Sequence, residues 1–216
     1  MAVPTETPDA LRARAGRIVA GLRRLHPSAT CELRHRTPLE LLVATILSAQ
    51  CTDERVNRVT PALFRRYAAA ADYAGADRAE LEDRIRSTGF FRNKSAALIG
   101  LGKALVERHG GEVPGRMEDL VALPGVGRKT ANVLLGTWFG RPAIVVDTHV
   151  ARLAGRLGLS SRADPEGIER DLSVLLPESD WTAVSHALIR HGRRVCKARR
   201  PDCAACALRP DCPHPA

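Results

Sequence analysis

Residues 120–132 read LVALPGVGRKTAN, and this stretch determines how the rest of the chain is interpreted. Residues 123–127, LPGVG, predict a tight hairpin, because glycine tolerates positive φ and lets another backbone come close. Residues 128–131, RKTA, then open a helix. Amide groups at such a hairpin and at a helix N-terminus can hold a phosphate without reading a base. A plain joint between two helices is the alternative interpretation.

Lys129 stands at the start of this expected helix, where the helix dipole disfavours added positive charge and lowers the cost of a neutral amine. A neutral lysine can form a Schiff base with a sugar carbon, whereas a charged one would simply bind phosphate. A helix over residues 128–139 climbs about 16 Å, and an extended return over residues 142–147 covers about the same length. Asp147 is therefore expected beside Lys129, as a helix cap, a base or a stabiliser of positive charge.

Four cysteines crowd into the C-terminal segment, with six, two and five residues between them. Such a set indicates zinc or an iron-sulfur cluster, and the spacing alone does not choose between them. Two disulfides are the rival interpretation, but the N-terminus has no basic region followed by an apolar one, so nothing suggests export. Cys31 and Cys51 are expected to be separate free thiols. The predicted metal ligands are Cys196, Cys203, Cys206 and Cys212.

The chain has 216 residues, a formal charge of +9 and a pI of about 9.9. This charge favours a polyanionic partner, although 29 of the 33 basic residues are arginine, a skew that a GC-rich genome would also produce. The longest apolar stretch, residues 41–49, is too short to cross a bilayer. We expect a soluble, cytoplasmic protein without membrane contact, and a monomer by default.

Helical periodicity recurs along most of the chain, so the predicted fold class is all-α. Residues 37–40, TPLE, indicate an N-cap, a first-turn proline and a capping-box glutamate. A helix starting near residue 53 should be kinked or split by Pro61. Only residues 143–146 look extended. Two helical lobes are expected: a central domain over residues 31–141, and a second domain formed by residues 1–30 with residues 142–216.

The hairpin LPGVGRKTA, the VDTHV segment at residues 146–150 and the cysteine spacing together resemble endonuclease III, of the helix-hairpin-helix superfamily. The resemblance extends to LLVATILSAQCTD at residues 41–53, STGFFRNKS at residues 87–95 and GEVP at residues 111–114. It implies a base-excision-repair DNA glycosylase with AP lyase activity on oxidised pyrimidines in duplex DNA. The DNA would lie in a cleft between the lobes.

The resemblance also implies roles for individual residues. Lys129 would attack C1′ of the damaged nucleotide and hold the sugar as a Schiff base, and Asp147 would assist. The four cysteines would hold a 4Fe-4S cluster that serves DNA docking rather than bond cleavage. Gln50 would fill the gap left by the unstacked base, and Phe90 would be the wedge, although the family usually has a smaller aliphatic residue there. The remaining expected DNA contacts are Leu123, Gly125, Val126, Gly127, Arg128 and Thr130.

Two competing functions stay open from the sequence. Adenine-mismatch glycosylases share the hairpin and the cluster but lack a lysine at the position of Lys129 and carry an additional C-terminal domain. The chain ends four residues after Cys212, which argues against them. A non-catalytic helix-hairpin-helix module stabilised by zinc is the second competitor. Visible absorption separates it from the enzyme, because an iron-sulfur cluster is brown and zinc is colourless.

Overall fold

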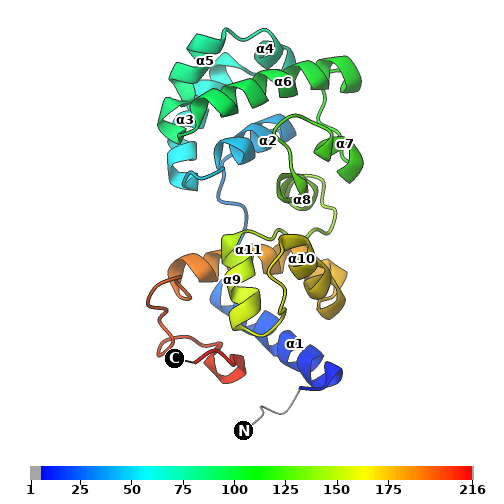
Figure 1. Cartoon of the computed structure of the whole chain (residues 1–216), viewed down its shortest axis with the longest axis vertical. Helices are drawn as coiled ribbons and strands as arrows, with labels where there is room; N and C mark the ends of the chain where they lie inside the picture. Colours follow the sequence, from blue (N-terminus) through cyan, green and yellow to red (C-terminus); the bar gives the residue numbers. More distant parts are fainter. Residues whose placement is uncertain (1–5, 216) are drawn as a thin grey trace. The chain divides into compact units, whose positions relative to one another are not determined.

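The computed structural model describes residues 6–215, and all regular structure in that range is helical, as predicted (Figure 1). Backbone contacts divide the chain into two compact units. We call Cys31–Arg141 the central unit, and Met1–Thr30 together with Pro142–Ala216 the split unit. No helix within the described range is long and apolar enough to cross a membrane.

The central unit is built around the long helix α6, against which α4 and α5 pack, while α2 packs on α8. Gly102 permits the close approach of α6 and α4, because a Cβ atom there would lie 2.5 Å from the backbone nitrogen of Ala74. Two short helices, α4 and α7, were not predicted. The helices are α2 (Pro38–Leu47), α3 (Asp53–Arg66), α4 (Ala70–Ala74), α5 (Arg78–Ile85), the 3₁₀ turn η1 (Arg86–Thr88), α6 (Phe91–His109), α7 (Met117–Val121) and α8 (Arg128–Thr137).

The structure differs from the local predictions for this unit at three places. Glu40 does not close a capping box on Thr37; its carboxylate accepts from the Arg36 backbone nitrogen at 2.6 Å, while the Thr37 hydroxyl caps the Glu40 nitrogen as expected. Of the two outcomes expected at Pro61, a kink or a split, the split does not occur, because α3 runs unbroken through this residue. Helix α8 also ends at Thr137, two residues before the expected Phe139.

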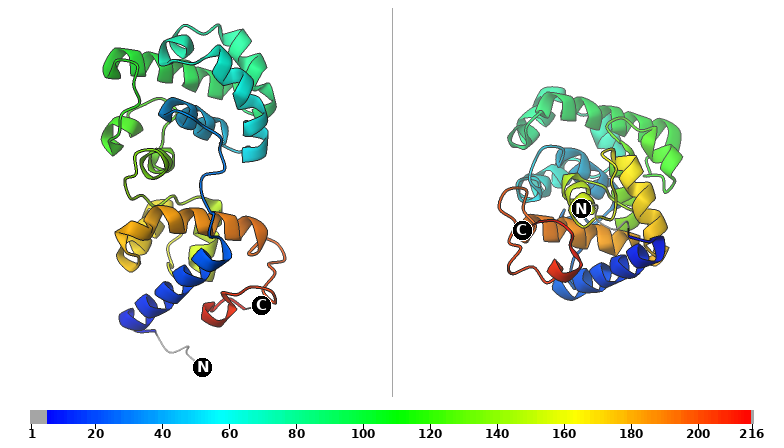
Figure 2. Two further views of the ribbon diagram at one scale, coloured as in Figure 1. Left: turned by 180° about the vertical axis from the view of Figure 1, so that it is seen from behind. Right: turned by 60° about the horizontal axis from the view of Figure 1, so that its bottom comes forward.

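The split unit brings the first helix of the chain against helices from its last third (Figure 2). Ile18 and Leu22 of α1 belong to one apolar core with Leu153 and Leu188. The extended residues 143–146 lie along α11, where the Val145 nitrogen donates to the Ser185 hydroxyl at 3.1 Å. The helices are α1 (Pro8–Leu25), α9 (Thr148–Arg156), α10 (Pro165–Leu175), η2 (Glu178–Asp180), α11 (Trp181–Arg194) and η3 (Arg209–Asp211).

Candidate active site and cysteine cavity

Helices α7 and α8 and the turn between them form the helix-hairpin-helix of the central unit. Gly125 has a φ of +78° and packs so closely on its neighbours that a Cβ atom would lie 2.9 Å from the Cβ of Ala97 in α6. The expected positive φ is therefore found at Gly125, and its close neighbour is the side chain of Ala97. Gly127 differs from the prediction: it is the N-cap of α8 with a φ of −96°, and a Cβ atom there would meet open space.

The hairpin presents its backbone rather than its apolar side chains. Leu123, Val126 and Thr130 are buried, so any contact they make with DNA must come from the main chain. The Val126 amide already donates to the Leu123 carbonyl. Within the described residues, the amides of Gly125 and Gly127 have no hydrogen-bond acceptor. These two donors are the ones free to hold a phosphate.

Lys129 occupies the second position of α8 and is exposed. Its amine has no hydrogen-bond or ion-pair partner in the part of the chain that the structure describes. A cation at the positive end of a helix gains nothing from the dipole. The fold thus places an accessible, unpaired primary amine directly beside the free hairpin amides.

Asp147 lies in the split unit and is the N-cap of α9. Its Oδ1 accepts from the backbone nitrogens of His149 and Val150, each at 2.8 Å. No acceptor role of its second oxygen is found within the described range. One carboxylate can therefore cap a helix and still offer an oxygen for chemistry. Its pairing with Lys129, which belongs to the other unit, stays a prediction.

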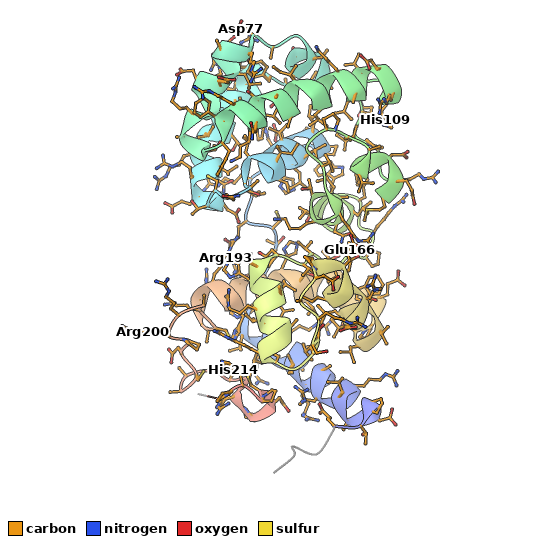
Figure 3. The ribbon with its side chains drawn as sticks, in the orientation of Figure 1. Asp77, His109, Glu166, Arg193, Arg200 and His214 are labelled. Atoms are coloured by element: carbon orange, nitrogen blue, oxygen red, sulfur yellow. The ribbon has the colours of Figure 1, made fainter. Side chains whose placement is uncertain are left out.

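His149 follows this carboxylate by two residues. Burial lowers its pKa, the charge of Asp147 opposes that shift, and the positive charges of Arg152 and Arg193 reinforce it. Its Nδ1 lies 3.1 Å from a guanidinium nitrogen of Arg152, which also donates to the Gly192 carbonyl. Arg193, whose charge helps to lower this pKa, lies in the last turn of α11 and is labelled in Figure 3.

Gln50 and Phe90 share an uncommon backbone conformation. Gln50 follows α2 with a φ of +52°, and Phe90 precedes α6 with a φ of +49°. Both are exposed, and the exposed fraction of Phe90 is 60%. Only one other described residue that is not glycine, Arg200, has a positive φ. Non-glycine residues adopt this conformation where surrounding structure imposes it, often at functional sites.

The four predicted cysteine ligands line one cavity in the split unit. Burial raises the pKa of the Cys206 thiol, a backbone hydrogen bond at Leu208 opposes the rise, and the other three thiols add to it. The four sulfur atoms are thus electrostatic neighbours. The cavity is lined by Leu153, Arg156, Leu157, His191, Val195, Cys196, Pro201, Asp202, Cys203, Cys206, Arg209, Cys212 and His214, the last of which is labelled in Figure 3.

Arginines hold the cysteine segment against the helices. Arg156 of α9 donates to the Cys196 sulfur at 3.3 Å and to the Lys197 carbonyl at 2.8 Å. Arg152 donates to the Cys196 carbonyl at 3.0 Å. Further along, Leu208 packs over Gly21 of α1, where a Cβ atom would lie 2.6 Å from its side chain. The cysteine segment is therefore held in place by a few hydrogen bonds, by the packing of Leu208 and by any metal group that the thiols bind.

Four thiols around one cavity are a donor set that both a zinc ion and an iron-sulfur cluster can use. A tetrahedral zinc site needs four sulfur atoms within about 2.3 Å of one point. Within residues 6–215 no group of three or more His, Cys, Asp or Glu side chains is placed to hold one metal ion. The cavity therefore gathers the thiols that a bound metal group would need, and the thiols alone do not identify that group.

One residue with no predicted role stands out. Lys94 in α6 is buried, and its ammonium donates to two backbone carbonyls. Two signals in the sequence pointed to it. It is one of four lysines among 33 basic residues, and it shares helical spacing with the buried Leu98, Leu101 and Leu105.

The helix-hairpin-helix and the fold around it define a class of DNA repair protein. Residues 43–178 match the model of the HhH-GPD superfamily of base excision DNA repair proteins. The chain is 57% identical to endonuclease III of Synechocystis sp. strain PCC 6803 over 93% of its own length and 92% of the relative's. It is 49% identical to endonuclease III of Bacillus subtilis over 85% and 84% of the two lengths.

Solved structures agree with the sequence relatives. A non-covalent endonuclease III–DNA complex superimposes with a TM-score of 0.90 at 43% identity, covering 94% of this chain and 95% of the other. A trapped endonuclease III–DNA covalent intermediate matches equally well. A thermostable thymine-DNA glycosylase shares the fold at 21% identity. The chain belongs to the endonuclease III family, and it is a DNA glycosylase with AP lyase activity.

Proposed function

We propose that the enzyme removes oxidised pyrimidines from duplex DNA, with Lys129 as the nucleophile. The neutral amine attacks C1′ of the damaged nucleotide, the bond from C1′ to the base breaks, and the base leaves with a proton. Ring opening gives a Schiff base between Lys129 and the sugar. Loss of a C2′ proton then breaks the C3′–O bond and releases the 3′ phosphate. The observation that carries this role is the exposed, unpaired amine at the N-terminus of α8.

Asp147 is proposed to serve the same sugar from the split unit. Its capping bonds occupy Oδ1, which leaves Oδ2 to accept a proton or to stabilise the cationic sugar. The Gly125 and Gly127 amides would hold a phosphate near the lesion. Arg128, the first residue of α8, would add a positive charge there. The net charge of +9 supports duplex DNA as the partner, and the nucleoid in the cytoplasm is the proposed place of action.

Cys196, Cys203, Cys206 and Cys212 are proposed to hold a 4Fe-4S cluster. The group would supply no step of bond cleavage; it would fix the basic C-terminal segment for docking on DNA. Support comes from the cavity that the four cysteines share and from the relatives named endonuclease III. The relatives named endonuclease III favour neither a non-catalytic zinc-stabilised module nor an adenine-mismatch enzyme.

Borohydride trapping tests the proposed nucleophile. Wild-type protein mixed with duplex DNA containing thymine glycol or an abasic site should form a reduced covalent adduct. Lys129→Gln should form none, because an amide cannot make the Schiff base, while its affinity for the duplex should change little. Lys103→Gln, at an exposed lysine of α6, is the matched control and should trap like wild type. An adduct that persists in Lys129→Gln rules out this assignment.

A further inference from the structure

The fold buries Lys94 and gives its ammonium two hydrogen-bond acceptors. The exposed fraction of the residue is 5%, and Nζ donates at 2.8 Å to the Leu47 carbonyl and at 2.8 Å to the Thr88 carbonyl. Burial lowers its pKa, while the nearby Cys51 acts in the opposite direction. A buried amine is costly unless it is hydrogen-bonded, so these two acceptors are what hold it in place.

The two acceptors are the last residues of two helices. Leu47 ends α2, and Thr88 ends η1. Carbonyls at a helix C-terminus lack donors from within the helix. After α2, the amides of Ser48, Ala49 and Cys51 return to other carbonyls, which leaves the Leu47 carbonyl to Lys94. Helix α2 has no basic residue in its own last turn, so Lys94 also supplies the favourable charge there.

Each of these helix ends leads into one of the exposed residues with positive φ. Gln50 lies three residues after Leu47, and Phe90 lies two residues after Thr88. The Lys94 backbone nitrogen also donates to the Phe90 carbonyl at 3.0 Å. One residue therefore joins the bases of both loops.

We propose that Lys94 is a positioning residue that fixes the separation of the Gln50 and Phe90 loops, so that both side chains enter the DNA stack together at a lesion. The inference rests on the proposed function, because it takes Gln50 and Phe90 as the residues that occupy the opened stack. Buried under both loops, Lys94 touches no reacting atom. Lys94 keeps the Gln50 and Phe90 turns at a fixed separation before DNA binds. This lowers the free energy needed to insert the two side chains into the DNA stack.

Lys94→Met tests this role, with Lys103→Met on the same helix as the control. The substrate is a duplex with a tetrahydrofuran abasic analogue opposite 2-aminopurine, and the readouts are fluorescence and affinity relative to undamaged duplex. Lys94→Met should lose about tenfold of the preference for the lesion, with weaker brightening of 2-aminopurine. Single-stranded abasic DNA has no stack to open, so its borohydride trapping should stay near wild type. Lys103→Met should match wild type in all readouts.

A double-mutant comparison separates positioning from general stability. If Lys94 acts through the two loops, Lys94→Met should add little to the loss already caused by Gln50→Ala with Phe90→Ala. Full additivity, or equal loss on damaged and undamaged duplex, overturns the proposal. Should Lys94→Met fail to fold, Lys94→Gln, which keeps amide donors, is put through the same measurements. Wild-type protein that traps no adduct would refute the proposed function instead.

Discussion

Asp147 illustrates how one side chain can serve structure and chemistry at once. Its Oδ1 caps α9 through two backbone amides, and the carboxylate is only partly buried. A cap needs an acceptor oxygen but no charge, whereas proton transfer or stabilisation of a cationic sugar needs the charge. The two roles can therefore be separated by choice of substitution.

Asp147→Asn should keep the cap and lower the turnover rate about 100-fold, because the amide oxygen still accepts from both nitrogens but cannot take a proton. Asp147→Ala should lower turnover similarly and in addition reduce the free energy of unfolding by about 1 kcal/mol. Single-turnover kinetics and urea denaturation measure the two effects. Unchanged turnover in Asp147→Asn would leave this residue as a cap only.

His149 gives a pH dependence with a defined sign. Burial lowers its folded-state pKa below the usual 6.5, so its neutral form stabilises the fold above that pH. As pH falls below about 6.5, the unfolded chain binds the proton first and this stability is lost. Urea denaturation from pH 7.5 to 5 should show a steeper loss for wild type than for His149→Gln. Equal slopes would contradict the shift.

At the scale of elements, the two glycines of the hairpin have different structural roles, which the sequence alone does not distinguish. Gly125 combines a φ of +78° with a 2.9 Å approach to Ala97, whereas Gly127 has negative φ and open space. Only the first has a packing and backbone requirement. Gly127 lies where DNA is proposed to bind. A side chain at this position would therefore interfere with the bound DNA and not with the folded protein.

Gly125→Ala should lower the free energy of unfolding by about 2 kcal/mol, because it adds both backbone strain and overlap with α6. Gly127→Ala is the matched control and should change stability by less than about 0.5 kcal/mol. Thermal or urea unfolding compares the pair. If Gly127→Ala instead weakens DNA binding at unchanged stability, the open space around it is where phosphate approaches. Equal destabilisation of both variants would count against this account of the turn.

Caps and periodicity explain which elements could be predicted from the sequence. Thr37 caps α2 as expected, because its side chain acts on an amide three residues away. Glu40 was misjudged, since its carboxylate accepts from the neighbouring Arg36 amide. Lys94 could not be assigned, because its acceptors are 47 and 6 residues away. The bond from Lys94 to the Leu47 carbonyl forms only when the chain is folded.

At the scale of the whole molecule, the cysteine segment is held by a few polar bonds, by little apolar packing and by the proposed cluster. Residues 196–215 contribute one buried hydrophobic side chain, Leu208, within the described part of the chain. Cys203→Ala should give colourless protein with a lower unfolding temperature and weaker DNA binding. Cys51→Ala, in the central unit, is the control and should keep its colour. Visible absorption and thermal unfolding are measured for both variants. A brown Cys203→Ala protein with normal DNA affinity would argue against Cys203 as a ligand of the proposed cluster.

The split unit has a consequence for synthesis on the ribosome. Helix α1 leaves the ribosome more than 100 residues before Leu153 and Leu188, against which it packs. The central unit is complete in the nascent chain well before then. During that interval Ile18 and Leu22 have no native neighbours, so the newborn amphipathic helix is the segment that a chaperone would bind.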